Sequence, residues 1–210
     1  MDSRAQEIKD VLEEMYPDAY CELNFSNELE LVIAVLLSAQ TTDKSVNKLT
    51  INLFKKYPTL DDYINVDIKE LENDLRRIGL YKNKAKNVKK LAVMIKEDFN
   101  GEVPRTQEEL EMLPGVGRKT ANVVLSVAFG IPAIAVDTHV ERVAKRLKLA
   151  YKNDSILKVE EKLMRKFNKE DWSKLHHQII FFGRYHCKAQ KPECEGCKLK
   201  HLCRYPNIYL

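Results

Sequence analysis

Four cysteines near the C-terminus form the pattern with the clearest chemistry in this sequence. Cys187, Cys194, Cys197 and Cys203 follow the spacing C-x6-C-x2-C-x5-C, among lysines and arginines. Thiolates at such short intervals are typical of a metal site, either a structural zinc ion or an iron-sulfur cluster, and the spacing alone does not separate the two. Cations on a segment folded around a metal favour a surface that binds a polyanion.

Other uses of these cysteines fit the sequence less well. Two disulfides require an oxidising compartment, and the charged stretch 1–14 lacks the apolar segment of a signal peptide. A redox Cys-x-x-Cys pair usually follows a strand, and no strand is predicted before Cys194. Cys21 lies far from the other four and is interpreted as a small buried residue.

A glycine-rich turn at 113–121, with the sequence LPGVGRKTA, is the second candidate site. Gly115 and Gly117 permit positive φ and the close approach of another molecule. The N–H groups from Val116 onward stand at a predicted helix start, where they lack partners and favour an anion, here a phosphate. Arg118 adds positive charge. A glycine-rich turn by itself is explained equally well by the tight packing of two helices.

Charge is distributed unevenly along the 210 residues, although the net charge is only +4. Residues 1–50 carry ten acidic and four basic side chains, whereas 76–96 carries eight basic and no acidic ones, and 184–204 carries six basic and two acidic ones. Each basic run alone is typical of a solvated helix face or tail. Two such runs in a chain that also carries a four-cysteine metal site indicate a protein that binds nucleic acid. The longest apolar run, 31–37, is too short to cross a bilayer, so we expect a soluble protein.

Apolar residues recur at three-to-four spacing along almost the whole chain, which predicts an all-α protein. Ser3, with Gln6 three residues later, is expected to cap the first helix, which ends before Pro17. The segment 29–39 is apolar on nearly all sides and is expected to be a central buried helix. The other predicted helices cover 44–56, 68–77, 83–99, 106–114, 118–129, 138–149, 156–167 and 173–186.

Four separated motifs together resemble the bacterial endonuclease III family of DNA glycosylases. They are LLSAQTTD at 36–43, IGLYKNKA at 78–85, the turn at 113–121, which is similar to a helix-hairpin-helix motif, and VDTHV at 136–140, and the cysteine tail follows them. The resemblance covers essentially the whole chain. It implies two helical domains with a cleft between them. One is a six-helix, barrel-like domain over 22–131 that carries the hairpin, and the other joins 1–21 to 132–210 and carries a cluster loop at 187–203.

The resemblance also implies a function in base excision repair. A protein of this family removes oxidised pyrimidines from duplex DNA and cleaves the abasic site by β-elimination through a lysine Schiff base. The implied cofactor is a 4Fe-4S cluster on the four tail cysteines, which decides iron over zinc. The implied partner is double-stranded DNA with a damaged pyrimidine or an abasic site. We expect a monomer in the cytoplasm, associated with the nucleoid and not with a membrane.

Alternatives remain open at this point. Mismatch and pyrimidine-dimer glycosylases belong to the same superfamily. A catalytically silent DNA-binding iron-sulfur protein would share the hairpin and the basic runs, and an electron carrier would need only the cluster.

Two residues that match the family motifs are the expected catalytic pair. Attack on a sugar C1′ requires a neutral amine, and three features favour that form of Lys119: the start of a helix, the neighbouring Arg118, and burial in a cleft. Asp137 precedes a predicted helix and is expected to be its N-cap, where its fixed negative charge suits an oxocarbenium-like centre. Proton transfer is a secondary role.

The remaining site residues are expected to contact DNA. An enzyme that acts on a base must rotate the nucleotide out of the duplex. The resemblance implies that Gln40 fills the vacated space and that Leu80 wedges between base pairs, although a helix-terminal glutamine and a core leucine are their ordinary readings. The other expected contacts are Gly115, Val116, Gly117, Arg118, His139 and Lys191.

Overall fold

The structure is a computed structural model that describes residues 1–205, all of it helices, turns and loops without a strand in that range. The chain divides into two compact units, one of residues 1–21 and 130–210 and the other of residues 22–129. The end of the predicted domain 132–210, residues 206–210, lies outside the described residues. Within 1–205 no helix has the length and apolar character needed to cross a membrane.

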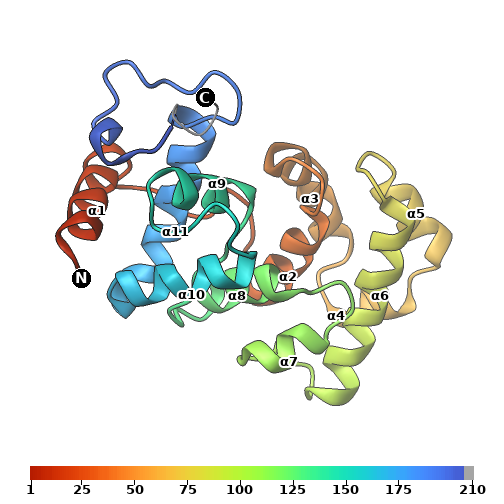
Figure 1. Cartoon of the computed structure of the whole chain (residues 1–210). Coiled ribbons are helices and arrows are strands. Elements are labelled where there is room, and N and C mark those ends of the chain that lie inside the picture. The colour runs from red at the N-terminus through yellow and green to blue at the C-terminus, as the bar shows by residue number, and fades with distance from the viewer. Residues whose placement is uncertain (206–210) are drawn as a thin grey trace. The chain divides into compact units, whose positions relative to one another are not determined.

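The central helix of the unit 22–129 is α2 (Glu28–Leu37), as predicted (Figure 1). Every residue from Leu31 to Leu37 is buried, which explains why the sequence is apolar on all sides. This helix contacts α3, α6 and α8. The other helices of the unit are α3 (Asp43–Lys56), α4 (Leu60–Asn65), α5 (Ile68–Leu75), α6 (Tyr81–Asp98), α7 (Gln107–Met112) and α8 (Arg118–Ala128).

Helix α4 was not predicted, although its start carries a sequence signal. The Thr59 side chain accepts a hydrogen bond from the Asp62 N–H, and the Asp62 carboxylate accepts one from the Thr59 N–H. This capping box satisfies two N–H groups of a helix only six residues long. Tyr63 fixes its inner face, because the ring is 1% exposed. The free energy gained from burial of Tyr63 and from the capping box outweighs the unfavourable free energy of forming so short a helix.

The unit formed by 1–21 and 130–210 packs its helices around a second core (Figure 1). That core joins residues from both parts of the chain, for example Ile8 and Leu12 with Val140, Val143 and Ile179. The helices of this unit are α1 (Ser3–Met15), α9 (Thr138–Arg146), α10 (Ile156–Lys166) and α11 (Trp172–Phe181), with short 3-10 helices at Lys169–Asp171 (η1) and Lys200–Leu202 (η3). The last predicted helix ends in a π-helical turn, Phe182–His186 (η2).

The cap of α1 differs from the prediction by one residue. Ser3 is the first residue of the helix, and Asp2 is the N-cap, whose carboxylate accepts a hydrogen bond of 2.7 Å from the Ala5 N–H. Both residue types cap helices well, so local preference does not choose between them. The Asp2 carboxylate also forms an ion pair with Lys166, with 3.3 Å between Oδ2 and Nζ. The uncharged side chain of Ser3 cannot form this ion pair.

Candidate functional site

The helix starts differ in a way that bears on the predicted site. Side chains cap the first turns of α1, α2, α3, α4, α5, α7, α9 and α10. Among the described α-helices, α6, α8 and α11 have no capping side chain. Helix α11 continues from the 3-10 helix η1, whereas the N-caps of α6 and α8 are Leu80 and Gly117, two predicted DNA contacts. Their first turns therefore have no capping side chain of the kind found at most other helices of the chain.

The hairpin between α7 and α8 requires glycine at position 115. Gly115 has φ +82°, a region that other residues rarely adopt. A Cβ at this position would lie 2.7 Å from the Asn87 amide nitrogen and 3.0 Å from a Leu36 methyl carbon. The turn thus packs directly against α6 and the end of α2. Position 117 is different, because its φ is −104° and a Cβ there would meet nothing within 4 Å.

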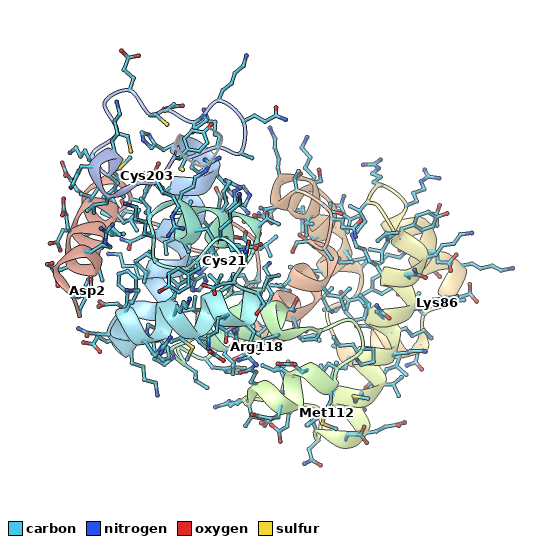
Figure 2. The ribbon with its side chains drawn as sticks, in the orientation of Figure 1. Asp2, Cys21, Lys86, Met112, Arg118 and Cys203 are labelled. Atoms are coloured by element: carbon cyan, nitrogen blue, oxygen red, sulfur yellow. The ribbon has the colours of Figure 1, made fainter. Side chains whose placement is uncertain are left out.

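One expectation about this turn is wrong. The Val116 N–H is not available to an anion, because it donates to the Leu113 carbonyl at 3.0 Å, and the valine side chain is buried. The first turn of α8 is the part of the hairpin without a capping side chain. Arg118, labelled in Figure 2, is the first residue of that helix and Lys119 the second, and both are exposed.

Lys119 is not buried as the sequence led us to expect. Burial in a cleft is one of the features expected to favour its neutral amine, but the side chain is exposed in the free protein. Desolvation of this amine must therefore come from a bound molecule. The position at the start of α8 and the neighbouring arginine are as predicted.

Asp137 is the N-cap of α9, as predicted. Its carboxylate accepts hydrogen bonds from the His139 N–H at 2.9 Å and the Val140 N–H at 2.8 Å. Both bonds end on Oδ1, and Oδ2 takes no further hydrogen bond from the part of the chain that the structure describes. The side chain is half-buried. One oxygen holds the helix, and the other is left for a ligand.

His139 is held by a residue that the sequence analysis missed. The Arg142 guanidinium lies 3.2 Å from His139 Nδ1 and also donates to the Gly183 carbonyl at 2.8 Å. An arginine is only a donor, so Nδ1 accepts and Nε2 carries the proton. Burial lowers the pKa of His139, which keeps the ring neutral. The ring can then donate Nε2–H to a phosphate oxygen. The spacing i, i+3 on one helix was the available signal.

Gln40 and Leu80 occupy adjacent turns with unusual backbone geometry. Their φ values are +55° and +58°, in the left-handed region that costs a side-chain-bearing residue about 1–3 kcal/mol. Leu80 is 54% exposed, which its interpretation as a core residue does not predict. A Cβ at Gly79 would lie 4.0 Å from the Gln40 carbonyl oxygen, so the two turns lie close together. Lys191 also has a positive φ, +50°, and is exposed.

The four tail cysteines line one cavity, and Cys21 does not. Its other walls include the apolar side chains of Leu147 and Phe182. Burial raises the pKa of the Cys197 and Cys203 thiols. Figure 2 shows Cys203 in the segment that follows α11. Across residues 1–205, no three side chains of the metal-binding types stand in an arrangement that fits a single ion.

A buried arginine supports the first of these cysteines. Arg146 is 3% exposed, and its guanidinium lies 3.3 Å from Cys187 Sγ and donates to the carbonyl of Lys188 at 2.8 Å. A buried cation at the wall of this cavity offsets the negative charge of a group bound there. The residues around this cavity therefore fit an anionic, thiolate-bound group.

The predicted residues fall into two sets. Gln40, Leu80 and the hairpin with Lys119 belong to the unit 22–129, whereas Asp137, His139, Lys191 and the cysteines belong to the other unit. Within each unit the structure fixes the contacts described above. The placement of Lys119 relative to Asp137 stays a prediction.

Comparisons with known proteins converge on one group. The family of HhH-GPD superfamily base excision DNA repair proteins matches residues 33–169. The protein named "Endonuclease III" from Bacillus subtilis (strain 168) is 62% identical over 195 residues, which is 93% of this chain and 89% of that protein.

Solved structures give the same picture at two levels of similarity. A structure described as "Structure of a Trapped Endonuclease III-DNA Covalent Intermediate: Estranged-Adenine Complex" has a TM-score of 0.94 and 58% identity, and covers 100% of this chain and 99% of its own. A thermostable thymine-DNA glycosylase has a TM-score of 0.89 but 25% identity, and covers 98% and 97%.

We predict that Gly115→Ala destabilises the protein, whereas Gly117→Ala does not. The alanine at 115 combines a positive φ with close contacts to Asn87 and Leu36, which together cost about 2 kcal/mol or more. At 117 the φ is ordinary and the space is open, so we expect a change within about 1 kcal/mol. Urea unfolding followed by circular dichroism measures both. Equal midpoints for the two variants would show that position 115 does not need glycine.

Proposed function

Because the chain belongs to the HhH-GPD superfamily of base excision DNA repair proteins and, within it, to the endonuclease III family, we propose that Lys119 is the nucleophile and that oxidised pyrimidines are the substrates. Family membership makes the chain a base-excision DNA glycosylase that also cleaves abasic sites. The observation that carries the proposal is the exposed lysine in a helix turn without a capping side chain.

The proposed reaction begins at the sugar of the damaged nucleotide. The Lys119 amine attacks C1′ while the bond from C1′ to the base breaks, and the base leaves with a proton. Opening of the sugar gives a Schiff base between the amine and C1′, which makes the C2′ proton acidic. Loss of that proton breaks the bond between C3′ and its oxygen, and the strand is cut. A relative with a TM-score of 0.94 is described as a trapped covalent intermediate with DNA, which supports a covalent step.

The start of α8 supplies the electrostatic setting for this step. First-turn N–H groups without a capping side chain and the positive end of the helix dipole attract a phosphate and disfavour a second cation. Arg118, the first residue of the helix, adds positive charge that also attracts a phosphate and also disfavours a second cation. A bound DNA strand would also remove water from the exposed Lys119 amine, which supplies the missing desolvation.

We assign Asp137 an electrostatic role. Two N–H bonds hold Oδ1 in place, so the carboxylate needs no reorganisation when positive charge develops on the sugar. Oδ2, which caps no N–H group, is the oxygen that we assign to this charge, with proton transfer from the attacking amine as a secondary role.

The remaining contacts are assigned to DNA binding and nucleotide extrusion. Gln40 fills the space of the extruded nucleotide, and Leu80 separates neighbouring base pairs. Gly115, Gly117 and Arg118 bring the hairpin close to a phosphate, and Val116 holds the turn through its buried side chain. His139 donates Nε2–H to a phosphate, and Lys191 contacts the backbone as a point charge.

The proposed cofactor is a 4Fe-4S cluster bound by Cys187, Cys194, Cys197 and Cys203. All four side chains line one cavity, together with apolar residues such as Leu147 and Phe182 and the charged Glu193 and Lys200, and four thiolates are the usual ligands of such a cluster. The cluster would hold the loop that carries Lys191 in one conformation, which is a structural role. We also propose that the two compact units are the domains 22–131 and 1–21 with 132–210, and that the protein acts as a monomer at the nucleoid.

Borohydride trapping on a duplex with one abasic site tests the nucleophile. Borohydride reduces a Schiff base to a stable amine, so the wild-type protein should give a covalent adduct. Lys119→Gln should give none, because an amide does not form a Schiff base. Arg118→Gln is the matched control, since it removes one charge at the neighbouring position. It should bind DNA more weakly and still give an adduct when the protein is in excess over its Kd.

A second control separates the role of Asp137 from that of the nucleophile. Asparagine caps helices as well as aspartate, so Asp137→Asn should fold normally. It should form the adduct more slowly, because the fixed negative charge is lost. Adduct formation by Lys119→Gln at the wild-type rate would refute the assignment of the nucleophile. Preferential release of mismatched thymine over oxidised pyrimidines would favour the alternative function, a mismatch glycosylase. Sequence identity favours endonuclease III, because the chain is 58% identical to the endonuclease III structure and 25% identical to the thymine-DNA glycosylase.

Metal analysis tests the cofactor. Protein purified without oxygen should contain about four iron atoms and four sulfide ions per chain, as a 4Fe-4S cluster requires. Cys197→Ser should lose iron and fold poorly, because the cavity then has one ligand fewer. Cys21→Ser is the matched control, since Cys21 does not line the cavity, and should keep its iron. One zinc ion per chain without sulfide would overturn the proposal.

A further inference from the structure

Lys84 is a buried lysine to which the proposed function gives no role. It lies on α6, is 4% exposed, and burial lowers its pKa. Its ammonium donates a hydrogen bond of 2.8 Å to the hydroxyl of Thr41. Burial of a lysine with a hydroxyl as its bonding partner normally costs stability. An apolar residue of the same length would fill this space at lower cost, so the position calls for another explanation.

The contacts of Lys84 join the two turns that carry the extrusion residues. Its backbone N–H donates to the Leu80 carbonyl at 3.0 Å, which closes the first turn of α6. Its side chain reaches Thr41, the residue after Gln40. Thr41 is itself held in its turn, since its N–H donates to the Ser38 carbonyl at 3.0 Å. One residue is therefore attached both to the Leu80 turn and to the Gln40 turn, which are 40 residues apart in the sequence.

These turns need such a connection because neither is held by its own conformational preference. Gln40 and Leu80 both have positive φ, and such residues persist only where the surrounding structure enforces the conformation. Helix α6 starts at Leu80 without a capping side chain. At Gly79 only an added Cβ, which glycine lacks, would lie 4.0 Å from the Gln40 carbonyl oxygen, so this approach supplies no directional link. The hydrogen bond from Lys84 to Thr41 is the directional link between the two segments.

We propose that Lys84 is a positioning residue that fixes the spacing of Gln40 and Leu80, so that both side chains enter the DNA stack together. The proposal rests on the function proposed above for those two residues. It does not depend on which base is excised. Lys84 itself touches neither the DNA nor the reacting atoms. Its hydrogen bond keeps the two side chains in the inserted arrangement before DNA binds, which reduces the ordering needed during extrusion.

The test uses a duplex that the enzyme can bind but not cleave. The damaged nucleotide is replaced by a tetrahydrofuran abasic analogue, which has no leaving group at C1′, and 2-aminopurine is placed opposite it. The change in 2-aminopurine fluorescence after rapid mixing reports the insertion of side chains next to the unpaired base. Leu80→Ala should remove most of this change, which establishes that the signal reports the wedge.

Lys84→Met should slow the fluorescence change about tenfold, the effect expected for loss of one hydrogen bond from a charged donor. Its thermal midpoint should equal or exceed that of the wild type, because a buried charge is removed. Thr41→Val should slow insertion to a similar extent, and Thr41→Ser should not. The double variant Lys84→Met with Thr41→Val should be about as slow as either single variant, since both lose the same bond. Lys86→Met is the control for loss of charge, because Lys86 is exposed on the same helix (Figure 2).

The outcomes separate this proposal from the proposed function. If Lys84→Met inserts as fast as Lys86→Met while Leu80→Ala is impaired, the positioning role is wrong and the wedge stands. If Leu80→Ala inserts normally, the wedge is wrong and the role of Lys84 falls with it. A Lys84→Met variant that is slow only in proportion to its loss of folded protein would assign a structural role and overturn the proposal. Borohydride trapping on a true abasic site reports separately on Lys119.

Discussion

The rest of the site depends on one constraint, namely that the first turn of an α-helix has N–H groups without intrahelical partners. Helices α8 and α9 meet this constraint in opposite ways. At α8 the N-cap is Gly117, which has no side chain that could cap the helix, and Lys119 lies in the first turn that follows. At α9 the cap is Asp137, which uses Oδ1 for two N–H groups and thereby becomes a rigid carboxylate. The same physical requirement thus underlies the proposed anion site in one unit and the carboxylate held by two hydrogen bonds in the other.

Several proposed DNA contacts are held in conformations that lower the stability of the free protein. Gln40, Leu80 and Lys191 have positive φ although none is glycine, and Lys84 buries a charge behind the first two. Costs of about 1–3 kcal/mol per strained residue are large beside the total stability of a domain. Such costs are tolerated at positions where the proposed function requires a side chain to point outward before DNA binds. The exposed Leu80 is the clearest case, because an unconstrained leucine would turn towards the core.

Local features of the fold could be predicted from the sequence, and long-range ones could not. The central helix α2, the hairpin and the cap at Asp137 follow from apolar periodicity, glycine and capping preferences within a few residues. Helix α4 was missed because six residues show little periodicity, although the capping box at Thr59 was readable. The roles of Lys84 and Arg142 depend on contacts 43 and 41 residues away, with Thr41 and Gly183. The paired Val116 N–H and the exposure of Lys119 likewise depend on how the hairpin packs, which no local pattern specifies.

In the proposed function the start of α8 has no capping side chain so that it can bind DNA. Gly117→Ser tests this role most directly, because the backbone at 117 already has the extended conformation of an N-cap and the space for a side chain is open. We expect serine to stabilise the protein by a few tenths to about 1 kcal/mol relative to Gly117→Ala, which adds the Cβ without the hydroxyl. We also expect Gly117→Ser to bind an abasic duplex about tenfold more weakly than Gly117→Ala, because the hydroxyl occupies N–H groups that the phosphate needs. A serine variant that is more stable than the alanine variant and binds DNA equally well would show that the first turn of α8 does not bind the phosphate.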